Sequence, residues 1–255
     1  MKKQIPNIFT LLNLFFGCVA IVYALQNGID IEYSNENGEF VKLTEKIYLA
    51  SLFIGLAAVV DFLDGFIARL LKVPSDMGKQ LDSLADVVSF GVAPGILLYQ
   101  FLRMGFIREN QGIETSIIWL LPAFIYSCAG AYRLARFNLD TSQSFGFKGV
   151  PIPAAGLVVA SLPLIYWYSD SETVANLLCN KWVLYAVIIL LSTLMVSKLP
   201  MMALKFKDFT LKNNLPKIIL LAIAVLAAIF LKWMAVPVVF IAYIILSLAL
   251  NKKQS

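Results

Sequence analysis

Four aspartates form the most unusual pattern in this 255-residue sequence. Asp61 and Asp64 are three residues apart, and Asp82 and Asp86 are four residues apart. On an α-helix both spacings place the two side chains on one face. A turn expected at residues 72–75, which include a proline, reverses the chain between the pairs. The sequence therefore predicts two antiparallel helices whose aspartate pairs face each other.

Carboxylates brought together in this way favour metal binding. Four of them inside an apolar bundle would repel one another and lose hydration, so protons or cations must compensate. Their oxygens are hard ligands that suit Mg²⁺ or Mn²⁺ better than zinc or copper. The chain has no histidine, which excludes Ser-His-Asp triads and histidine general bases. Carboxylates are left as the plausible acid–base groups.

A simpler interpretation is that these aspartates are solvated at helix ends or cap a helix. Asp82 could do so near a helix N-terminus. Asp61 and Asp64, however, directly follow the apolar run IYLASLFIGLAAVV at residues 47–60. An ionisable group inside a membrane span indicates a functional site by default. We therefore favour a functional role for the aspartates.

Small residues and one arginine surround the aspartates. Gly65 and Ala68 follow the first pair, and Gly78 precedes the second. A helix face without bulky side chains allows a ring or a phosphate to approach the backbone. Close helix packing through small residues is the alternative. Arg69 could clamp phosphate oxygens, or it could simply anchor the cytoplasmic side of the span.

The elements that carry these residues are expected to be membrane spans. The chain is 60% hydrophobic and 15% charged, whereas soluble domains average about 45–50% apolar and about 25% charged residues. The N-terminus has two lysines before an apolar run but no small-residue cleavage site, which predicts an uncleaved first span. Three widely separated cysteines predict neither a disulfide framework nor a metal site.

Apolar runs long enough to cross about 30 Å of hydrocarbon, which takes roughly 20 residues, recur along the chain. The predicted fold is therefore all-α, a polytopic transmembrane helical bundle with eight spans. We place the spans at residues 8–26, 46–68, 84–102, 117–137, 151–168, 181–198, 216–231 and 234–250. The last two are separated only by Lys232 and Trp233 and could form a helical hairpin.

Basic residues decide the predicted orientation. With eight spans, 15 of the 21 lysines and arginines fall on the side of the two termini, and all seven glutamates fall on the other side. The positive-inside rule therefore places both termini in the cytoplasm. We expect a multi-pass protein of the cell (inner) membrane whose active site faces the cytoplasm.

One loop, at residues 198–217, carries five lysines. The ordinary interpretation is that they determine topology, and the alternative is that they bind anionic lipid headgroups. The net charge of +5 has the same two interpretations. No nucleic-acid partner is expected.

The pattern around the aspartates resembles the signature of the CDP-alcohol phosphotransferases. D-x-x-D-G-x-x-A-R, eight further residues and G-x-x-x-D-x-x-x-D are matched in full between residues 61 and 86. The resemblance implies two divalent ions, Mg²⁺ or Mn²⁺, one held by Asp61, Asp64 and Asp82 and the other by Asp61, Asp82 and Asp86. The residues expected to bind the CDP-lipid are Pro6, Asn7, Thr10, Gly65, Ala68, Arg69, Ser75 and Gly78.

Three further segments resemble the phosphatidylserine synthase branch of that family. They are LDSLADVVSFGVAPG at 81–95, AYRLARFNLD at 131–140 and FKGVPIPAAG at 147–156. With them the resemblance covers about residues 1–160, the expected catalytic core, and leaves 161–255 as further transmembrane helices of the same domain. It implies CDP-diacylglycerol and L-serine as substrates, and a homodimer.

Cations beside the gap between the fourth and fifth spans could bind the carboxylate of the acceptor. Arg133, Arg136 and Lys148 supply charge, and Asn138 supplies a polar contact. An arginine fork suits a carboxylate better than a lysine does, and positive-inside anchoring is the alternative. Asp86 is the expected general base for the serine hydroxyl. Attack on the phosphorus attached to diacylglycerol would give phosphatidylserine and CMP.

Three other functions stay open. In a phosphatidylglycerophosphate synthase the same cations would bind glycerol phosphate. In a transporter or channel the aspartates would line an ion path, but polar residues should then be spread through the depth of the membrane. Here they gather at the predicted cytoplasmic ends, which favours an enzyme. A structural membrane scaffold would leave the buried carboxylates unexplained.

Overall fold

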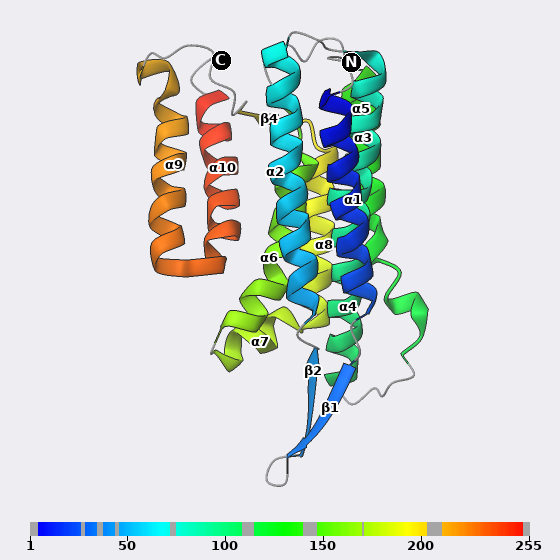
Figure 1. Ribbon diagram of the computed structural model, residues 1–255. Coiled ribbons are helices and arrows are strands. Elements are labelled where there is room, and N and C mark those ends of the chain that lie inside the picture. The colour runs from blue at the N-terminus through cyan, green and yellow to red at the C-terminus, as the bar shows by residue number, and fades with distance from the viewer. Residues whose placement is uncertain are drawn as a thin grey trace.

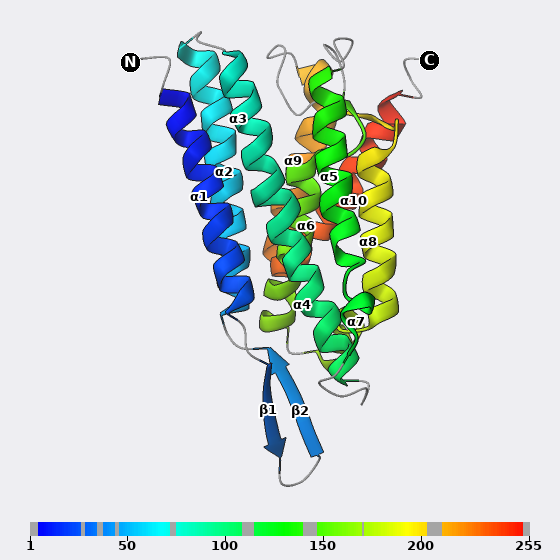
Figure 2. The ribbon, with the colours of Figure 1, turned by 90° about the vertical axis from the view of Figure 1, so that its right-hand side faces the viewer.

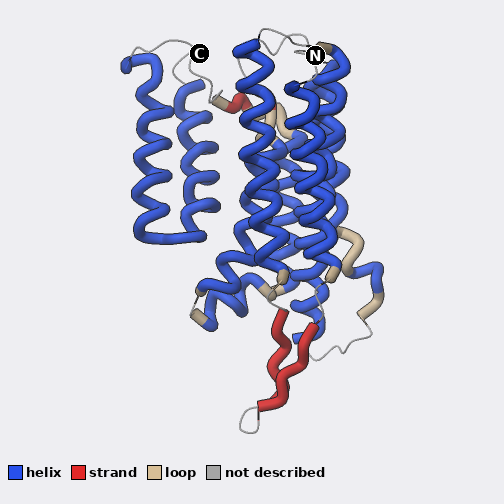
Figure 3. The backbone as a smooth tube through the Cα atoms, in the orientation of Figure 1, coloured by secondary structure: helices blue, strands red, loops and turns tan. Residues whose placement is uncertain are grey.

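The computed structural model describes residues 5–26, 29–34, 38–43, 46–71, 75–108, 115–139, 147–169, 171–202 and 211–251. Over these residues the chain is a bundle of long helices with two very small sheets (Figure 1, Figure 3). Large apolar side chains such as Phe62 and Phe230 are exposed on the outside, as lipid contact requires. The predicted fold class, an all-α membrane bundle, is confirmed.

Three helices carry the aspartates and their neighbours. α1 covers Ile5–Leu25 and α2 covers Ile47–Leu71, and the two lie side by side and antiparallel (Figure 1, Figure 2). α3, Asp76–Asp86, runs back along α1. Its N-cap is Ser75, whose Oγ accepts a hydrogen bond of 3.0 Å from the amide of Gly78. This bond satisfies one of the free amides at the helix start.

The third predicted span belongs to a longer helix. α3 continues into a π-helical segment, η2 (Val87–Val92), and then into α4 (Ala93–Arg108) without a break. Since the helix already begins at Asp76, the second aspartate pair lies within a helix, as predicted. Residues 72–74 of the predicted turn lie outside the described residues.

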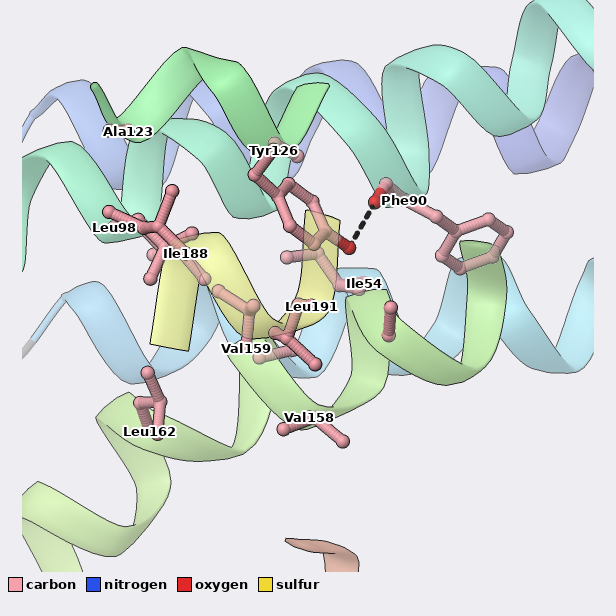
Figure 4. Close-up of a cluster of buried hydrophobic side chains, with 14 of the residues drawn as sticks. Ile54, Phe90, Leu98, Ala123, Tyr126, Val158, Val159, Leu162, Ile188 and Leu191 are labelled. Carbon is pink, nitrogen blue, oxygen red and sulfur yellow. Dashed lines mark hydrogen bonds between the residues drawn. The ribbon is translucent and has the colours of Figure 1, made fainter. Parts of the chain in front are cut away.

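Helix α5 (Ala123–Leu139) stabilises the π-helical segment. The Tyr126 hydroxyl donates to the Phe90 carbonyl oxygen at 2.9 Å (Figure 4). The Ser127 hydroxyl donates to the Gly91 carbonyl oxygen at 2.8 Å. π-Helical turns are frequent at functional sites, and this one begins directly after the last of the four aspartates.

The predicted fourth span begins too early in the sequence. Residues Ile117–Trp119 form a 3₁₀ turn, η3, and α5 begins only at Ala123, directly after Pro122. Proline has no amide hydrogen and its ring clashes with the preceding helical turn. It therefore separates the two helical pieces, and the prediction of one helix from residue 117 is wrong.

Two more helices complete the bundle core. α6 (Ile152–Tyr168) packs against α2 and α4, and α8 (Lys181–Val196) packs against α5. Val159 and Leu191 from these helices are buried in the same apolar cluster as the Tyr126 ring (Figure 4). A short helix, α7 (Glu172–Leu178), leads into α8.

The last two helices form a hairpin beside the bundle (Figure 1). α9 covers Leu211–Leu231 and α10 covers Ala235–Asn251, with the 3₁₀ turn η4 (Lys232–Met234) between them. The hairpin predicted at this corner is confirmed. Lys232 has a φ of 51°, so the reversal uses a left-handed residue.

Two small antiparallel sheets connect the helices. β1 (Ile29–Ser34) pairs with β2 (Gly38–Leu43), and β3 (Phe147–Lys148) pairs with β4 (Pro200–Met201). The sequence prediction contained no strands. Apolar and polar residues do alternate along 29–34, which indicates a strand. The longer apolar runs on either side are a stronger pattern, and the prediction followed them.

The hairpin of α9 and α10 is hydrogen-bonded to the rest of the bundle next to β4. The Tyr243 hydroxyl donates to the Met202 carbonyl oxygen at 2.9 Å, and the Met202 amide donates to Ser247 Oγ at 3.1 Å. The amide of Gly149 donates to the Leu199 carbonyl oxygen at 2.8 Å. These contacts lie at the end of the bundle where α1 begins (Figure 1).

The protein is a multi-pass membrane protein. Four stretches of described helix are long and apolar enough to cross a bilayer, namely Pro6–Leu25, Ile47–Leu71, Asp76–Arg108 and Asn214–Leu250. A fifth results if α7 and α8, which meet at a 60° bend, form one broken span. Helices occupy all eight predicted span positions, and α1 begins at the end of the bundle where α10 ends (Figure 1). The count of eight spans and the side of the termini stay predictions.

Candidate active site

Three carboxylates from two helices meet near the end of the bundle where α1 begins. Oxygens of Asp61 and Asp64 on α2 and of Asp82 on α3 lie within 4.8 Å of one another. Asp64 is buried and the other two are half-buried. The predicted convergence of the two helices is confirmed for these three of the four aspartates. Asp82 lies inside α3, whose N-cap is Ser75, so the alternative that Asp82 caps this helix is wrong.

Helix α1 adds a hydroxyl to this three-carboxylate cluster. The Thr10 Oγ1 lies 2.8 Å from Asp64 Oδ2 and 3.2 Å from the Pro6 carbonyl oxygen. A hydroxyl has one proton to donate, and the shorter contact is to the carboxylate. Thr10 is only 4% exposed, so this contact fixes the orientation of Asp64 inside the bundle.

Asp86 lies one helical turn further into the bundle and is 7% exposed. It is not part of the three-carboxylate cluster, although it interacts electrostatically with Asp61 and Asp82. Its hydrogen-bond partner is Asn13 on α1, whose Nδ2 donates to Asp86 Oδ1 at 3.4 Å. Its predicted roles as a metal ligand and as the base stay predictions.

The sequence prediction missed Asn13. Asn7, Thr10 and Asn13 are spaced by three residues, which places them along one face of α1. In a helix that is otherwise almost entirely apolar, this polar stripe was the available signal. A single asparagine inside an apolar run was not enough to separate it from ordinary helix packing.

The arginine predicted as a phosphate clamp lies over a glycine. A Cβ added at Gly65 would lie 3.4 Å from a terminal guanidinium nitrogen of Arg69. Arg69 is exposed and interacts electrostatically with Asp64. The absence of a side chain at Gly65 thus leaves room for the guanidinium group of Arg69. The predicted contacts of Gly65, Ala68 and Arg69 with the CDP-lipid stay predictions.

The start of α3 lies against the start of α1. A Cβ added at Gly78 would lie 3.1 Å from Asn7 Oδ1 and 2.9 Å from Ser75 Oγ. The glycine therefore permits a close approach of the two helices, as the packing alternative suggested. The same approach brings Asn7 and Ser75, both predicted to contact the CDP-lipid, to one place.

Among the four residues predicted to bind the acceptor, Arg133 lies deepest. It is 5% exposed, and its guanidinium carbon lies 5.7 Å from the centre of the Phe137 ring. It interacts electrostatically with Asp86 and with Tyr243 of α10. Its Nε has no hydrogen-bond partner among the described residues. The structure thus places one buried cation where it interacts with Asp86.

Arg136 faces a different neighbour. Its two terminal nitrogens donate to the carbonyl oxygens of Val196 at 2.7 Å and Ser197 at 2.9 Å. These carbonyls belong to the C-terminal end of α8, where helical carbonyls lack partners and a cation is favourable. Arg136 therefore caps α8 and connects it to α5.

The other two predicted acceptor residues also lie where elements meet. Asn138 Nδ2 donates to Ser83 Oγ at 2.8 Å, and its carbonyl oxygen accepts a bond of 3.3 Å from Lys79 Nζ, so it joins α5 to α3. Lys148 is exposed on β3. Their contacts with serine stay predictions.

The donor set fits a hard divalent cation. Three carboxylates whose oxygens lie within 4.8 Å of one another would repel strongly in an apolar bundle unless a cation or protons neutralise them. Oxygen ligands of this kind favour Mg²⁺ or Mn²⁺. Asp61, Asp64 and Asp82 are therefore the residues that could hold such an ion.

The sequence of this chain is similar to those of known proteins. The chain matches the family model described as CDP-alcohol phosphatidyltransferase over residues 3–197. It is 30% identical over 233 residues to a CDP-diacylglycerol–serine O-phosphatidyltransferase of Helicobacter pylori, covering 89% of this chain and 81% of that protein. The Bacillus subtilis protein of the same name is 40% identical over 124 residues, which cover 49% of this chain and 65% of that protein. The Mycobacterium tuberculosis protein of that name is 27% identical over 247 residues, covering 94% of this chain and 75% of that protein.

The family match extends from α1 to the end of α8 and contains every predicted site residue. It thus includes both helices that carry the aspartates, as well as Thr10 and Arg133. The chain belongs to the CDP-alcohol phosphatidyltransferase family.

Proposed function

We propose that this protein transfers the phosphatidyl group of CDP-diacylglycerol to the hydroxyl of L-serine, giving phosphatidylserine and CMP. The observation that carries the proposal is the meeting of Asp61, Asp64 and Asp82 within 4.8 Å in a chain of this family. Serine as the acceptor is supported by the names of the similar proteins described above and by the buried cation Arg133, which interacts electrostatically with Asp86.

Two divalent ions, Mg²⁺ or Mn²⁺, are part of the proposal. Asp61, Asp64 and Asp82 would hold one ion, and Asp86 would join Asp61 and Asp82 around the other. When bound, such ions stabilise charge on the attacking and leaving oxygens of the phosphoryl group. Thr10 and Asn13 hold Asp64 and Asp86 by hydrogen bonds of 2.8 and 3.4 Å, as residues behind metal ligands commonly do.

The CDP moiety would lie over the small residues Gly65 and Ala68. Arg69, next to Asp64, would pair with phosphate oxygens, for which a guanidinium group is well shaped. Pro6, Asn7, Ser75 and Gly78 lie where α1 and α3 begin, and we assign them to the nucleotide end of the substrate. Thr10, which was also predicted to bind the CDP-lipid, would act through its hydrogen bond to Asp64.

The acceptor serine would place its carboxylate on Arg133. A buried guanidinium group whose Nε makes no hydrogen bond to the described residues has a donor to offer to an anion. Arg136 is occupied at both terminal nitrogens by the end of α8, so its contribution would be to hold α5 in place. Asn138 and Lys148 would border the entrance.

In the proposed reaction Asp86 takes the proton from the serine hydroxyl. The serine oxygen forms a bond to the phosphorus attached to diacylglycerol, and the bond from that phosphorus to the bridging oxygen of CMP breaks. A positioned carboxylate acting as general base typically contributes about 10²–10⁴ in rate. Burial beside Asn13 keeps Asp86 in place for this transfer.

We place the site at the cytoplasmic face of the cell (inner) membrane, because the basic residues favour that side. Residues 1–160 would form the catalytic core, with the remaining helices in the same membrane domain. A homodimer is expected from the family resemblance. The two described carboxylates that are buried, Asp64 and Asp86, both belong to the site, which supports an enzyme over an ion path.

The test is an acceptor assay with the purified full-length chain in detergent. CDP-diacylglycerol and Mg²⁺ or Mn²⁺ are incubated with labelled L-serine, glycerol 3-phosphate or inositol phosphate in turn. We expect label in lipid only with serine. Label from glycerol 3-phosphate instead would identify a phosphatidylglycerophosphate synthase and contradict the acceptor assignment while leaving the family intact.

A further inference from the structure

Asn13 is a fully buried amide at the centre of α1. Its exposed fraction is 0%, and it lies between the apolar residues Leu12 and Leu14. Nδ2 donates to Asp86 Oδ1 at 3.4 Å, whereas Oδ1 has no hydrogen-bond partner among the described residues. A buried polar atom without a partner destabilises a fold. An amide at this position is therefore better explained by what its donor does for Asp86 than by packing.

The backbone around Asn13 is held tightly. Ser89, in the π-helical segment η2, donates its hydroxyl to the Asn13 carbonyl oxygen at 3.0 Å. One turn further along α1, a Cβ added at Gly17 would overlap Ser89. Helix α1 and the π-helical segment are thus in direct contact at this depth. Neither contact involves the Asn13 amide group, which is the group that donates to Asp86.

The location of the contact is also informative. Asp86 is the last residue of α3, directly before the π-helical segment begins. The Asn13 amide group donates to this carboxylate, so α1 contacts the helix at the point where its hydrogen-bonding pattern changes. A contact of 3.4 Å is long, and catalytic hydrogen bonds are often long before the site is loaded.

We infer that Asn13 is a positioning residue for Asp86: its amide group holds one carboxylate oxygen and thereby leaves the other available to the reaction. This inference rests on the proposed function for the role of Asp86. The geometry on which it stands, a buried amide donating to a buried carboxylate, is independent of the acceptor. The alternative is that Asn13 only joins α1 to η2.

A matched pair of variants separates these two roles. Asn13→Leu removes the amide and keeps the volume, while Ser89→Ala removes a hydrogen bond between the same two elements at the same depth without touching Asp86. Loss of a residue that orients a metal ligand typically reduces metal affinity or activity by about 10–100-fold. We expect that loss for Asn13→Leu and an activity within about twofold of the wild type for Ser89→Ala.

Two readouts are measured on full-length protein in detergent. The first is the split between kcat and KM: Asn13→Leu should lower kcat and leave the KM for CDP-diacylglycerol nearly unchanged, because the contact serves the reacting groups and not the nucleotide. The second is Mn²⁺ affinity without substrates, followed by electron paramagnetic resonance. Asn13→Leu should weaken Mn²⁺ binding and Ser89→Ala should not.

Equal losses in both variants, or no loss in Asn13→Leu, would overturn the inference and leave Asn13 as a packing residue. If Asn13→Leu does not elute as a folded protein, Asn13→Ala is measured in the same way. Failure of the wild-type protein to label lipid with serine would instead contradict the proposed function. The Mn²⁺ measurement still decides the role of Asn13 in that case.

Discussion

The carboxylates of Asp61, Asp64 and Asp82 come from two helices and lie close together. Their spacing places them on facing helix surfaces, and Thr10 fixes Asp64 by a hydrogen bond of 2.8 Å. At the scale of single residues the site is an arrangement of acceptors that a hard cation would complete. Asp86 stands one turn deeper, held by Asn13 at 3.4 Å.

Asp82→Asn should abolish activity without unfolding the bundle. The amide keeps the shape of the side chain but loses the charge and half of the metal-binding capacity, so we expect activity to fall by more than about 10²-fold. The measurement is serine incorporation by purified protein that elutes as a single peak. The matched control is Asp76→Asn, an exposed aspartate in the first turn of α3, which should remain active. Wild-type turnover by Asp82→Asn would contradict the metal assignment.

Arg133→Leu should act on the acceptor. A hydrogen bond to a charged group is worth about 1.5–3 kcal/mol, so loss of the Arg133 contact should raise the KM for serine about 10-fold or more. The KM for CDP-diacylglycerol should stay within about twofold. Steady-state kinetics with each substrate varied in turn would check this. An unchanged KM for serine would remove Arg133 from the acceptor site.

Single residues of the site were largely predictable from the sequence, but not their partners. The four aspartates, Arg69 and Arg133 follow from charge in an apolar chain and from a specific motif. Asn13 did not, because its importance depends on Asp86, which lies 73 positions away in the sequence. A contact between distant helices leaves little trace in local residue patterns.

At the scale of elements, the helices do more than carry side chains. The π-helical segment η2 interrupts the regular pattern directly after Asp86, and Tyr126 and Ser127 of α5 supply donors to its carbonyl oxygens at 2.9 and 2.8 Å. Helix α5 also meets the end of α8 through Arg136. Contacts between α3, α5 and α8 thus position the residues that we propose to bind the acceptor.

Arg136→Leu should therefore destabilise the fold and leave acceptor binding alone. Two hydrogen bonds to the end of α8, of 2.7 and 2.9 Å, are lost, and we expect a decrease of about 1–3 kcal/mol in the free energy of unfolding. The midpoint of thermal unfolding in detergent would fall, while the KM for serine of the folded fraction would stay within about twofold. A large rise in that KM with unchanged thermal stability would instead make Arg136 a serine ligand.

The features that were not predicted correctly from the sequence were missed for physical reasons. The start of α5 was placed too early because apolar residues continue through Pro122, and composition alone does not register the break. The β1–β2 pairing depends on hydrogen bonds between two short segments, which apolar-run length does not detect. Arg136 caps α8 through carbonyl oxygens that lie 60 and 61 positions away in the sequence. Local sequence therefore does not show that its guanidinium group has these partners.

At the scale of the whole molecule, the proposed chemistry lies at one end of the bundle. The start of α1, the start of α3, which carries Asp82, and the contacts of β4 with α10 all lie at that end (Figure 1). Tyr243 of α10 interacts electrostatically with Arg133, so the C-terminal hairpin lies next to the proposed acceptor residue Arg133. The bundle, its membrane character and the final hairpin were predictable, because hydropathy and span length depend only on local sequence.

The orientation in the membrane can be tested with single cysteines. In a chain whose native cysteines are replaced by alanine, Lys79→Cys lies beside the site and Glu172→Cys lies at the start of α7, near the opposite end of the bundle (Figure 1). We expect a membrane-impermeant maleimide to label Glu172→Cys on intact cells and Lys79→Cys only after lysis. The reverse pattern would place the active site outside the cytoplasm.

The proposed reaction is tested most directly by the ratio of its two products. Purified full-length protein is incubated with CDP-diacylglycerol, L-serine and Mg²⁺ or Mn²⁺, and CMP and phosphatidylserine are quantified in the same sample. The predicted result is equal amounts of the two products, with both lost when a chelator removes the divalent ions and both restored when the ions are added back. CMP release without phosphatidylserine, or phosphatidylserine formation that survives the chelator, would contradict it.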